Sequence, residues 1–274
     1  MTPPTEDPTN PRGAPMTAAD VPIPPLRRRL RTALQAGEPA VGTFVKLASP
    51  DVVELAAAAG FGFVVVDLEH STLTERDAVD LVRHADVCGL PALVRVPEVD
   101  AACVNRLLEA GAAGIQLSML TRLAQAEALV AATRFAPAGR RSVSLANRAA
   151  RFGAAPLAGF LRAEENDPPV LVGQIETART DPLPELVAAL DVCFLGSTDL
   201  AVDLGLPADP AVLRAAVDRV RDAAHGAGVA FGGWAPTRAA AKDLGLGDAG
   251  YLVVGSDLQM LAAGLRAAAG EGDQ

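Results

Sequence analysis

The chain has 274 residues, of which 50% are hydrophobic and 4% aromatic, and its formal net charge at pH 7 is -9. This size suits one large α/β domain, and the negative charge argues against a nucleic-acid partner, because binding phosphates requires a basic surface. No apolar run reaches the roughly 18 residues of a membrane-spanning helix, so we predict no membrane partner.

The cysteines and the N-terminal residues indicate a cytoplasmic protein. Cys88, Cys103 and Cys193 are odd in number, widely spaced and embedded in apolar segments, which is typical of reduced thiols and not of a zinc site. The first residues lack the charged start and apolar core of a secretion signal. Residues 1–24 are rich in proline and polar residues, so we predict a disordered leader before a single domain over residues 25–270.

After residue 24, helical and strand patterns alternate regularly. The predicted strands are Ala40–Val45, Phe63–Val66, Ala92–Val96, Gly114–Leu117, Val170–Ile175, Val192–Leu195, Val229–Gly232 and Tyr251–Val254. The predicted helices are Leu26–Ala36, Asp51–Ala59, Glu75–Val87, Ala102–Ala110, Leu123–Thr133 and Ala211–His225. Eight strands that alternate with helices predict a parallel sheet closed into a (β/α)₈ TIM barrel.

Two features of this pattern bear on the architecture. An open doubly wound sheet is the alternative fold, but it would require a glycine-rich turn after the first strand, and residues 42–46 offer none. The stretch Thr121–Pro169 is too long for one crossover, and we expect its arginine-rich centre to cap the mouth of the barrel. These arginines are Arg140, Arg141, Arg148 and Arg151.

Polar clusters follow several of the predicted strands, where a barrel collects its catalytic groups. Asp67, Glu69 and His70 follow the second strand, and a histidine flanked by carboxylates can exchange protons near neutral pH. A hydrogen-bonded polar loop is the alternative there. Arg95 ends the third strand and could bind a ketoacid or a developing oxyanion. A structural ion pair with Asp67 or Glu69 is its alternative.

A second pair of carboxylates follows two consecutive strands. Glu176 comes directly after Val170–Ile175, and Asp199 follows Val192–Leu195. With no histidine or cysteine beside them, all-oxygen ligation suits Mg²⁺ or Mn²⁺ with retained waters. Asp199 could instead cap the helix that begins at residues 197–199, whose free N–H groups would favour a bound carboxylate or phosphate.

Lysine is scarce, and this limits the mechanisms that use an amine. Lys46 and Lys242 are the only lysines, and only Lys46 ends a predicted strand, so a Schiff-base mechanism has one candidate. One histidine, one arginine and two separate carboxylates suit metal-assisted enolisation better than imine chemistry.

Taken in order, these segments resemble the HpcH/HpaI aldolase/citrate lyase family, in particular its class II pyruvate aldolases of the 4-hydroxy-2-oxoheptanedioate aldolase type. The similarity runs from about Leu30 to Leu265, and each motif is weak alone but specific as an ordered set. The motifs are AGFGF at 59–63, DLEH at 67–70, VR at 94–95, LLEAG at 107–111, TRFAPAGRR at 133–141, QIE at 174–176, FLGSTDL at 194–200 and VVGSD at 253–257.

The resemblance implies a (β/α)₈ barrel whose last helix is exchanged between subunits of a homo-oligomer, a hexamer or trimer. It implies a divalent metal cation, Mg²⁺, Mn²⁺ or Co²⁺, held by Glu176 and Asp199. Substrate contacts would come from Gln174, Ser197, Thr198 and Asp199, and the catalytic groups would be His70, Arg95 and Glu109. The implied reaction is reversible cleavage of a 4-hydroxy-2-oxo acid to pyruvate, or a related 2-oxo acid, and an aldehyde. A citrate-lyase-like acyl-CoA lyase is the related alternative.

The chain departs from the usual pattern of this family at three positions. Leu68 replaces a glycine between the acidic residues that precede His70, and Ser197 replaces a proline before the metal-binding aspartate. Glu109 stands where the family usually has an aspartate that supports the histidine.

Overall fold

The computed structural model describes residues 25–180 and 182–270, so the predicted leader lies outside the described residues. The strands are β1 (Ala40–Val45), β2 (Phe63–Asp67), β3 (Ala92–Val96), β4 (Gly114–Leu117), β5 (Val170–Ile175), β6 (Val192–Leu195), β7 (Ala230–Ala235) and β8 (Tyr251–Ser256). The helices are α1 (Pro25–Gln35), α2 (Pro50–Ala58), α3 (Glu75–Val87), α4 (Ala101–Ala110), α5 (Leu123–Thr133), α6 (Leu157–Asn166), α7 (Leu183–Ala188), α8 (Ser197–Asp203), α9 (Pro210–Gly226) and α10 (Asp257–Ala268), with a 3₁₀ turn, η2, at Arg151–Gly153.

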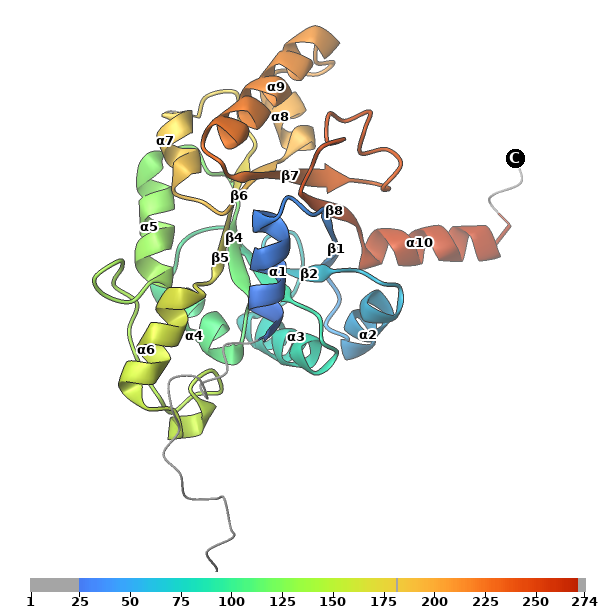
Figure 1. Cartoon of the computed structure of the whole chain (residues 1–274). Coiled ribbons are helices and arrows are strands. Elements are labelled where there is room, and N and C mark those ends of the chain that lie inside the picture. Colours follow the sequence, from blue (N-terminus) through green and yellow to red (C-terminus); the bar gives the residue numbers. More distant parts are fainter. Residues whose placement is uncertain (1–24, 181, 271–274) are drawn as a thin grey trace, which may run out of the picture.

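The eight strands of the described residues form a closed parallel barrel in the order β1 to β8, with β8 paired to β1 (Figure 1). This confirms the predicted (β/α)₈ fold and rules out the open doubly wound sheet. Because all strands run in the same direction, their carboxyl ends meet at one end of the barrel. Residues that follow different strands are therefore brought together there.

Side-chain alternation along each strand decides which residues enter the barrel interior. On β2, Val64 and Val66 pack outward against the helices, whereas Phe63 and Val65 belong to the cluster that fills the barrel. Asp67 is the next inward position on β2, just above this apolar filling. By the same alternation, Lys46 is the inward position that follows Phe44 on β1. The polar side chains of Asp67 and Lys46 therefore lie above the apolar side chains that fill the barrel.

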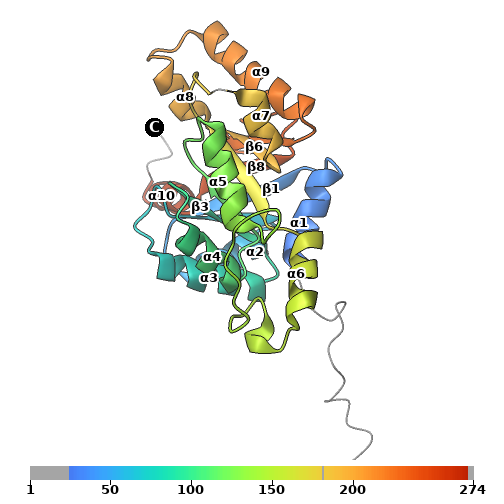
Figure 2. The same ribbon diagram turned by 90° about the vertical axis from the view of Figure 1, so that its left-hand side faces the viewer.

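Helix α1 covers the amino end of the barrel (Figure 1). Its Leu30 packs with the interior cluster, and its Arg31 Nη1 lies 2.8 Å from Asp191 Oδ1. Arg27 Nη2 lies 2.6 Å from Glu164 Oε1 on α6, and Figure 2 shows α1 and α6 together on the same side of the barrel. The open end is therefore the carboxyl end.

The long segment between α5 and β5 does not cap the mouth, so that prediction is wrong. Arg148 pairs with Asp86 near the end of α3, and the N–H of Ala149 donates to the carbonyl of Glu109 at the end of α4. Helices end where the chain returns to the amino ends of the strands. Arg148 and likewise Arg141, through Glu164 on α6, therefore serve ion pairs at the covered end of the barrel.

Helix α10 differs from the other helices that follow strands, because it projects away from the barrel (Figure 1). Three leucines along it, Leu258, Leu261 and Leu265, are 43%, 52% and 62% exposed. None of the helices in the described part of the chain is long and apolar enough to cross a membrane.

Candidate active site at the carboxyl end of the barrel

A cavity of about 370 Å³ opens at the carboxyl end of the barrel. It brings together the predicted site residues from four strand ends, namely His70, Arg95, Gln174, Glu176, Ser197, Thr198 and Asp199. Residues that are more than 100 positions apart in the sequence thus share one wall. The cavity has the features of a barrel active site.

A buried ion pair lies beside this cavity and contributes one of its lining residues, Arg95. Asp67 is fully buried, and its Oδ1 and Oδ2 lie 2.8 Å from Nε and 2.6 Å from Nη2 of Arg95. Burial alone would raise the pKa of Asp67, but the hydrogen bonds and charge of Arg95 hold this pKa well below its ordinary value. The ion pair left open by the sequence is therefore present, and Arg95 also lines the cavity, stacked 4.2 Å above the ring of Phe44.

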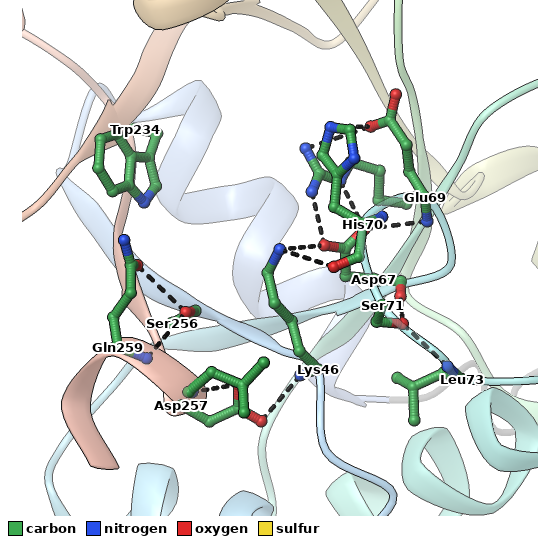
Figure 3. A network of polar contacts seen from close by, with 12 residues as sticks. Lys46, Asp67, Glu69, His70, Ser71, Leu73, Trp234, Ser256, Asp257 and Gln259 are labelled. Carbon is green, nitrogen blue, oxygen red and sulfur yellow. Dashed lines mark hydrogen bonds and ion pairs between the residues drawn. The ribbon is translucent and has the colours of Figure 1, made fainter. Parts of the chain in front are cut away.

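The loop after β2 carries His70 to the rim of the cavity (Figure 3). Asp67 Oδ1 accepts the backbone N–H groups of Glu69, at 3.0 Å, and of His70, at 3.2 Å. The His70 side chain is 59% exposed, and its Nε2 lies 3.6 Å from Glu69 Oε2. The loop after β2 is therefore held by hydrogen bonds to Asp67, and the same loop presents an accessible His70 to the cavity.

Glu176 is buried in the cavity wall with both oxygens held. Its Oε1 accepts a 2.7 Å hydrogen bond from Gln174 Nε2, and its Oε2 accepts one of 2.7 Å from the backbone N–H of Met119. Burial raises the pKa of Glu176, and the charges of Glu69 and Asp199 act in the same direction. A Cβ on Gly196 would lie 2.7 Å from Glu176 Oε1, so glycine is required there for Glu176 to occupy this place.

Asp199 lies on the exposed side of the same cavity, in the first turn of α8. The N-cap of α8 is Gly196 and has no side-chain hydrogen bond, so Asp199 does not cap the helix. No group of three or more His, Cys, Asp or Glu side chains suited to a metal was found within residues 25–180 and 182–270. Glu176 and Asp199 are nevertheless two oxygen donors facing one cavity, a set that fits a hard divalent cation which keeps other positions for water or substrate oxygens.

Behind Gln174, two further polar residues continue into the barrel interior. Tyr251 OH donates to Gln116 Oε1 at 3.2 Å, and Gln116 Nε2 donates to Gln174 Oε1. Arg95 Nη1 donates to the same Gln174 oxygen at 3.4 Å. With its oxygen facing these donors, the Gln174 amide presents its N–H group to Glu176. Sequence reasoning missed both Gln116 and Tyr251, although an inward-facing glutamine in a short apolar strand was a detectable signal.

The opposite wall of the cavity was also missed. Trp234 at the end of β7 and Gln259 in the first turn of α10 lie across from His70, with Lys46 between the two walls (Figure 3). Trp234 Nε1 donates to the carbonyl of Gly255 at 3.3 Å, and Ser256 Oγ donates to Gln259 Oε1 at 3.1 Å. The predicted strand Val229–Gly232 ended before Trp234, and no helix was predicted over the residues that include Gln259.

Glu109 is not brought to the cavity. It lies in the last turn of α4, where Asn105 Nδ2 donates to its Oε1 at 3.4 Å, at the covered end of the barrel. The resemblance placed it beside His70, but a helix that ends at the amino side of the next strand carries its last residues away from the mouth. Among the residues that the structure describes, Glu109 is therefore not part of the cavity lining.

Comparisons with known proteins agree with this geometry. The model of the family described as HpcH/HpaI aldolase/citrate lyase matches residues 40–263. A hydroxypyruvate/pyruvate aldolase of Pseudomonas aeruginosa is 33% identical over 262 residues, covering 92% of this chain and 93% of the relative. A 4-hydroxy-2-oxovalerate aldolase of Novosphingobium aromaticivorans is 35% identical over 180 residues, covering 64% and 67%. The crystal structure of an HpcH/HpaI family protein of Burkholderia cenocepacia superposes with a TM-score of 0.80 at 31% identity, covering 91% of this chain and 99% of that one.

Proposed function

Because the chain belongs to the HpcH/HpaI aldolase/citrate lyase family and is a carbon–carbon lyase, we propose that it is a divalent-metal-dependent class II aldolase. It reversibly cleaves a 4-hydroxy-2-oxo acid to pyruvate, or a related 2-oxo acid, and an aldehyde. The observation that carries this proposal is the convergence of Arg95, His70, Glu176 and Asp199 on one cavity.

The cation would be held by Glu176 and Asp199. When bound there, Mg²⁺, Mn²⁺ or Co²⁺ supplies Lewis-acid stabilisation of negative charge on the 2-oxo group. Gln174, Ser197 and Thr198 line the cavity beside these carboxylates and bind the 2-oxo acid. Arg95 contributes a fixed positive charge close to the oxygen that becomes negative, in a site where the charge needs no rearrangement during the reaction.

His70 is the proposed acid/base. In cleavage it accepts the proton of the 4-hydroxyl group, the C3–C4 bond breaks, and the aldehyde leaves while the electron pair of that bond forms the enolate of the 2-oxo acid. A proton returned to C3 then completes pyruvate. The exposed ring of His70 at the cavity rim, backed by Glu69, suits a group that must reach both protons.

The test is exchange of the methyl protons of pyruvate with D₂O, followed by NMR. We expect exchange that EDTA abolishes and Mg²⁺, Mn²⁺ or Co²⁺ restores, and losses of at least about 100-fold in His70→Ala and in Glu176→Ala. Exchange indifferent to both the metal and Glu176 would contradict the proposal. An acyl-CoA lyase would instead turn over a CoA thioester.

A Schiff-base mechanism is the second candidate, because Lys46 lines the cavity. Lys46 Nζ uses its N–H groups as donors to Asp67 Oδ2 at 2.9 Å and to the carbonyl of His70 at 3.0 Å. A nucleophilic amine must present a free lone pair to the substrate carbonyl. Borohydride with pyruvate would trap an imine at Lys46 only if this candidate were correct.

We also propose that the protein is a homo-oligomer, a hexamer or trimer, in which α10 packs on a second copy. The exposed Leu258, Leu261 and Leu265 are spaced as one apolar stripe of a helix, which needs a covering surface.

A further inference from the structure

Lys46 is the first inward-facing residue after β1, and its main chain is fixed from a distant part of the sequence. Asp257 Oδ2, in the first turn of α10, accepts the backbone N–H groups of Lys46 at 2.8 Å and of Leu47 at 2.9 Å. The Lys46 side chain is only 17% exposed. It therefore leaves β1 in a defined direction, across the cavity wall toward the loop of His70 (Figure 3).

The ammonium group of Lys46 completes a clamp on the main chain of His70. Asp67 Oδ1 accepts the N–H of His70 at 3.2 Å, and Lys46 Nζ donates to the carbonyl oxygen of His70 at 3.0 Å. Lys46 Nζ also lies 2.9 Å from Asp67 Oδ2, so the two holding groups bind each other. Both polar groups of the His70 main chain are thereby held.

The negative charge of Asp67 does not by itself explain why a lysine stands at position 46. Arg95 already meets both oxygens of Asp67 with two charge-assisted hydrogen bonds, a strong and geometrically specific pairing. What Lys46 adds is the bond to the His70 carbonyl. Within residues 25–180 and 182–270, the one charged partner recorded for the imidazole ring is Glu69, at 3.6 Å, so the direction of the ring depends on its main chain.

We propose that Lys46 is a positioning residue, which aims the His70 ring at the substrate by holding the His70 carbonyl. The proposal rests on the acid/base role of His70 proposed above. A displaced base can cost on the order of 100-fold in rate when a side chain moves by about 1 Å, whereas binding of the 2-oxo acid by other groups is unaffected. Lys46 should therefore influence kcat and not KM for pyruvate.

The experiment measures metal-dependent methyl exchange of pyruvate in four single variants and one double variant of the full chain. Lys46→Met keeps the length of the side chain without its donors, and Lys46→Arg restores donors but cannot form an imine. Lys242→Met is the matched control, because Lys242 is exposed and lies outside the cavity. His70→Ala and Lys46→Met/His70→Ala complete a double-mutant cycle. Circular dichroism and the unfolding midpoint show whether each variant is folded.

We expect Lys46→Met to lower kcat roughly 10- to 100-fold with KM for pyruvate within about twofold. Lys46→Arg should recover most of this loss, and Lys242→Met should equal the wild type. In the His70→Ala background, Lys46→Met should cause almost no further loss, because a residue that acts through His70 has nothing left to position.

Four results would overturn the proposal. The first is an unchanged kcat in folded Lys46→Met, and the second is an effect of Lys46→Met on KM alone. The third is additive losses in Lys46→Met/His70→Ala. The fourth is an inactive Lys46→Arg variant together with borohydride trapping of an imine in the wild type. Wild-type protein that exchanges no pyruvate protons with any of the metals would instead refute the proposed function itself. The two failures are therefore distinguishable.

Discussion

At the scale of single residues, the site places two buried carboxylates in opposite environments. Arg95 and Lys46 surround Asp67 and stabilise its charged form, whereas Glu176 is desolvated and faces other carboxylates, so its pKa is raised. Asp67 thus acts as a structural anchor for the histidine loop. The protein compensates the charged form of Glu176 poorly, and a bound cation would stabilise that form.

The lowered pKa of Asp67 predicts how stability depends on pH. A group whose pKa is depressed on folding adds stability that is present above its unfolded pKa of about 3.9 and is lost as pH falls below it. Asp67→Asn should lower the free energy of unfolding at pH 7 by roughly 3–5 kcal/mol, because it leaves buried cations unpaired. Urea unfolding between pH 3 and pH 7 should also show that the free energy of unfolding declines less steeply below pH 4 than in the wild type.

Glu54→Gln, at an exposed ion pair with His84, is the control and should change neither the free energy of unfolding at pH 7 nor its decline below pH 4 appreciably. A pH profile of Asp67→Asn identical to that of the wild type would contradict this reasoning.

The chain from Tyr251 to Gln174 predicts an effect on metal binding that is separate from stability. In the double variant Gln116→Leu/Tyr251→Phe both hydrogen-bonding partners become apolar, which is close to neutral for folding. The Gln174 oxygen then loses the donor from Gln116 and retains the one from Arg95. The amide of Gln174 is held less firmly, so the hydrogen bond from Gln174 to Glu176 weakens. We expect Mn²⁺ affinity, measured by calorimetry, to fall roughly threefold to tenfold, in line with other partners of metal ligands. Tyr251→Phe alone should cost about 1–3 kcal/mol of stability by leaving the Gln116 oxygen unpaired. Unchanged Mn²⁺ affinity in the folded double variant would contradict this role.

At the scale of elements, most of the barrel followed from periodicity, because short apolar strands and amphipathic helices differ clearly in their patterns. One exception is the end of β7. The predicted strand Val229–Gly232 ended at the first glycine of a pair, whereas β7 continues through both glycines to Ala235. The glycines are required by close packing between neighbouring strands, which a single sequence does not display. Trp234, which follows the glycine pair, was lost from the predicted site for this reason. The alternation that places Asp67, Arg95 and Gln174 inward was visible, so the other half of the site could be predicted.

The glycine pair of β7 gives a prediction about the barrel. A Cβ on Gly232 would meet the carbonyl oxygen of Tyr251 on β8 and lie 2.9 Å from the Tyr251 Cβ, and this backbone cannot move aside cheaply. Gly232→Ala should therefore destabilise the protein by about 1–3 kcal/mol, as overpacked cores do. Gly226→Ala at the end of α9, where a Cβ would have open space, should be neutral or stabilising by up to about 1 kcal/mol. Thermal unfolding of both variants checks the contrast, and a Gly232→Ala protein as stable as the wild type would refute it.

At the scale of the whole molecule, the two ends of the barrel have different tasks. Helix α1 and the arginine-rich segment close the amino end with buried ion pairs, and the carboxyl end stays open for chemistry. Helix α10 belongs to the open end and is tied to it at its start, since Asp257 holds the main chain of Lys46. A surface that fixes α10 would thus also support the wall that holds His70.

This link makes assembly and activity testable together. Leu261→Glu and Leu265→Glu place charges on the exposed stripe of α10, away from the cavity lining, and should dissociate a homo-oligomer held through this helix, because charged groups are costly to bury at an interface. Sedimentation velocity at micromolar concentration should show a trimer or hexamer for the wild type and a smaller species for the double variant, with reduced pyruvate proton exchange. Val87→Glu, at a residue 79% exposed at the end of α3, serves as the control and should change neither property. A wild type that sediments as a monomer would end the assembly proposal while leaving the site at the barrel mouth intact, since every residue assigned to it comes from one chain.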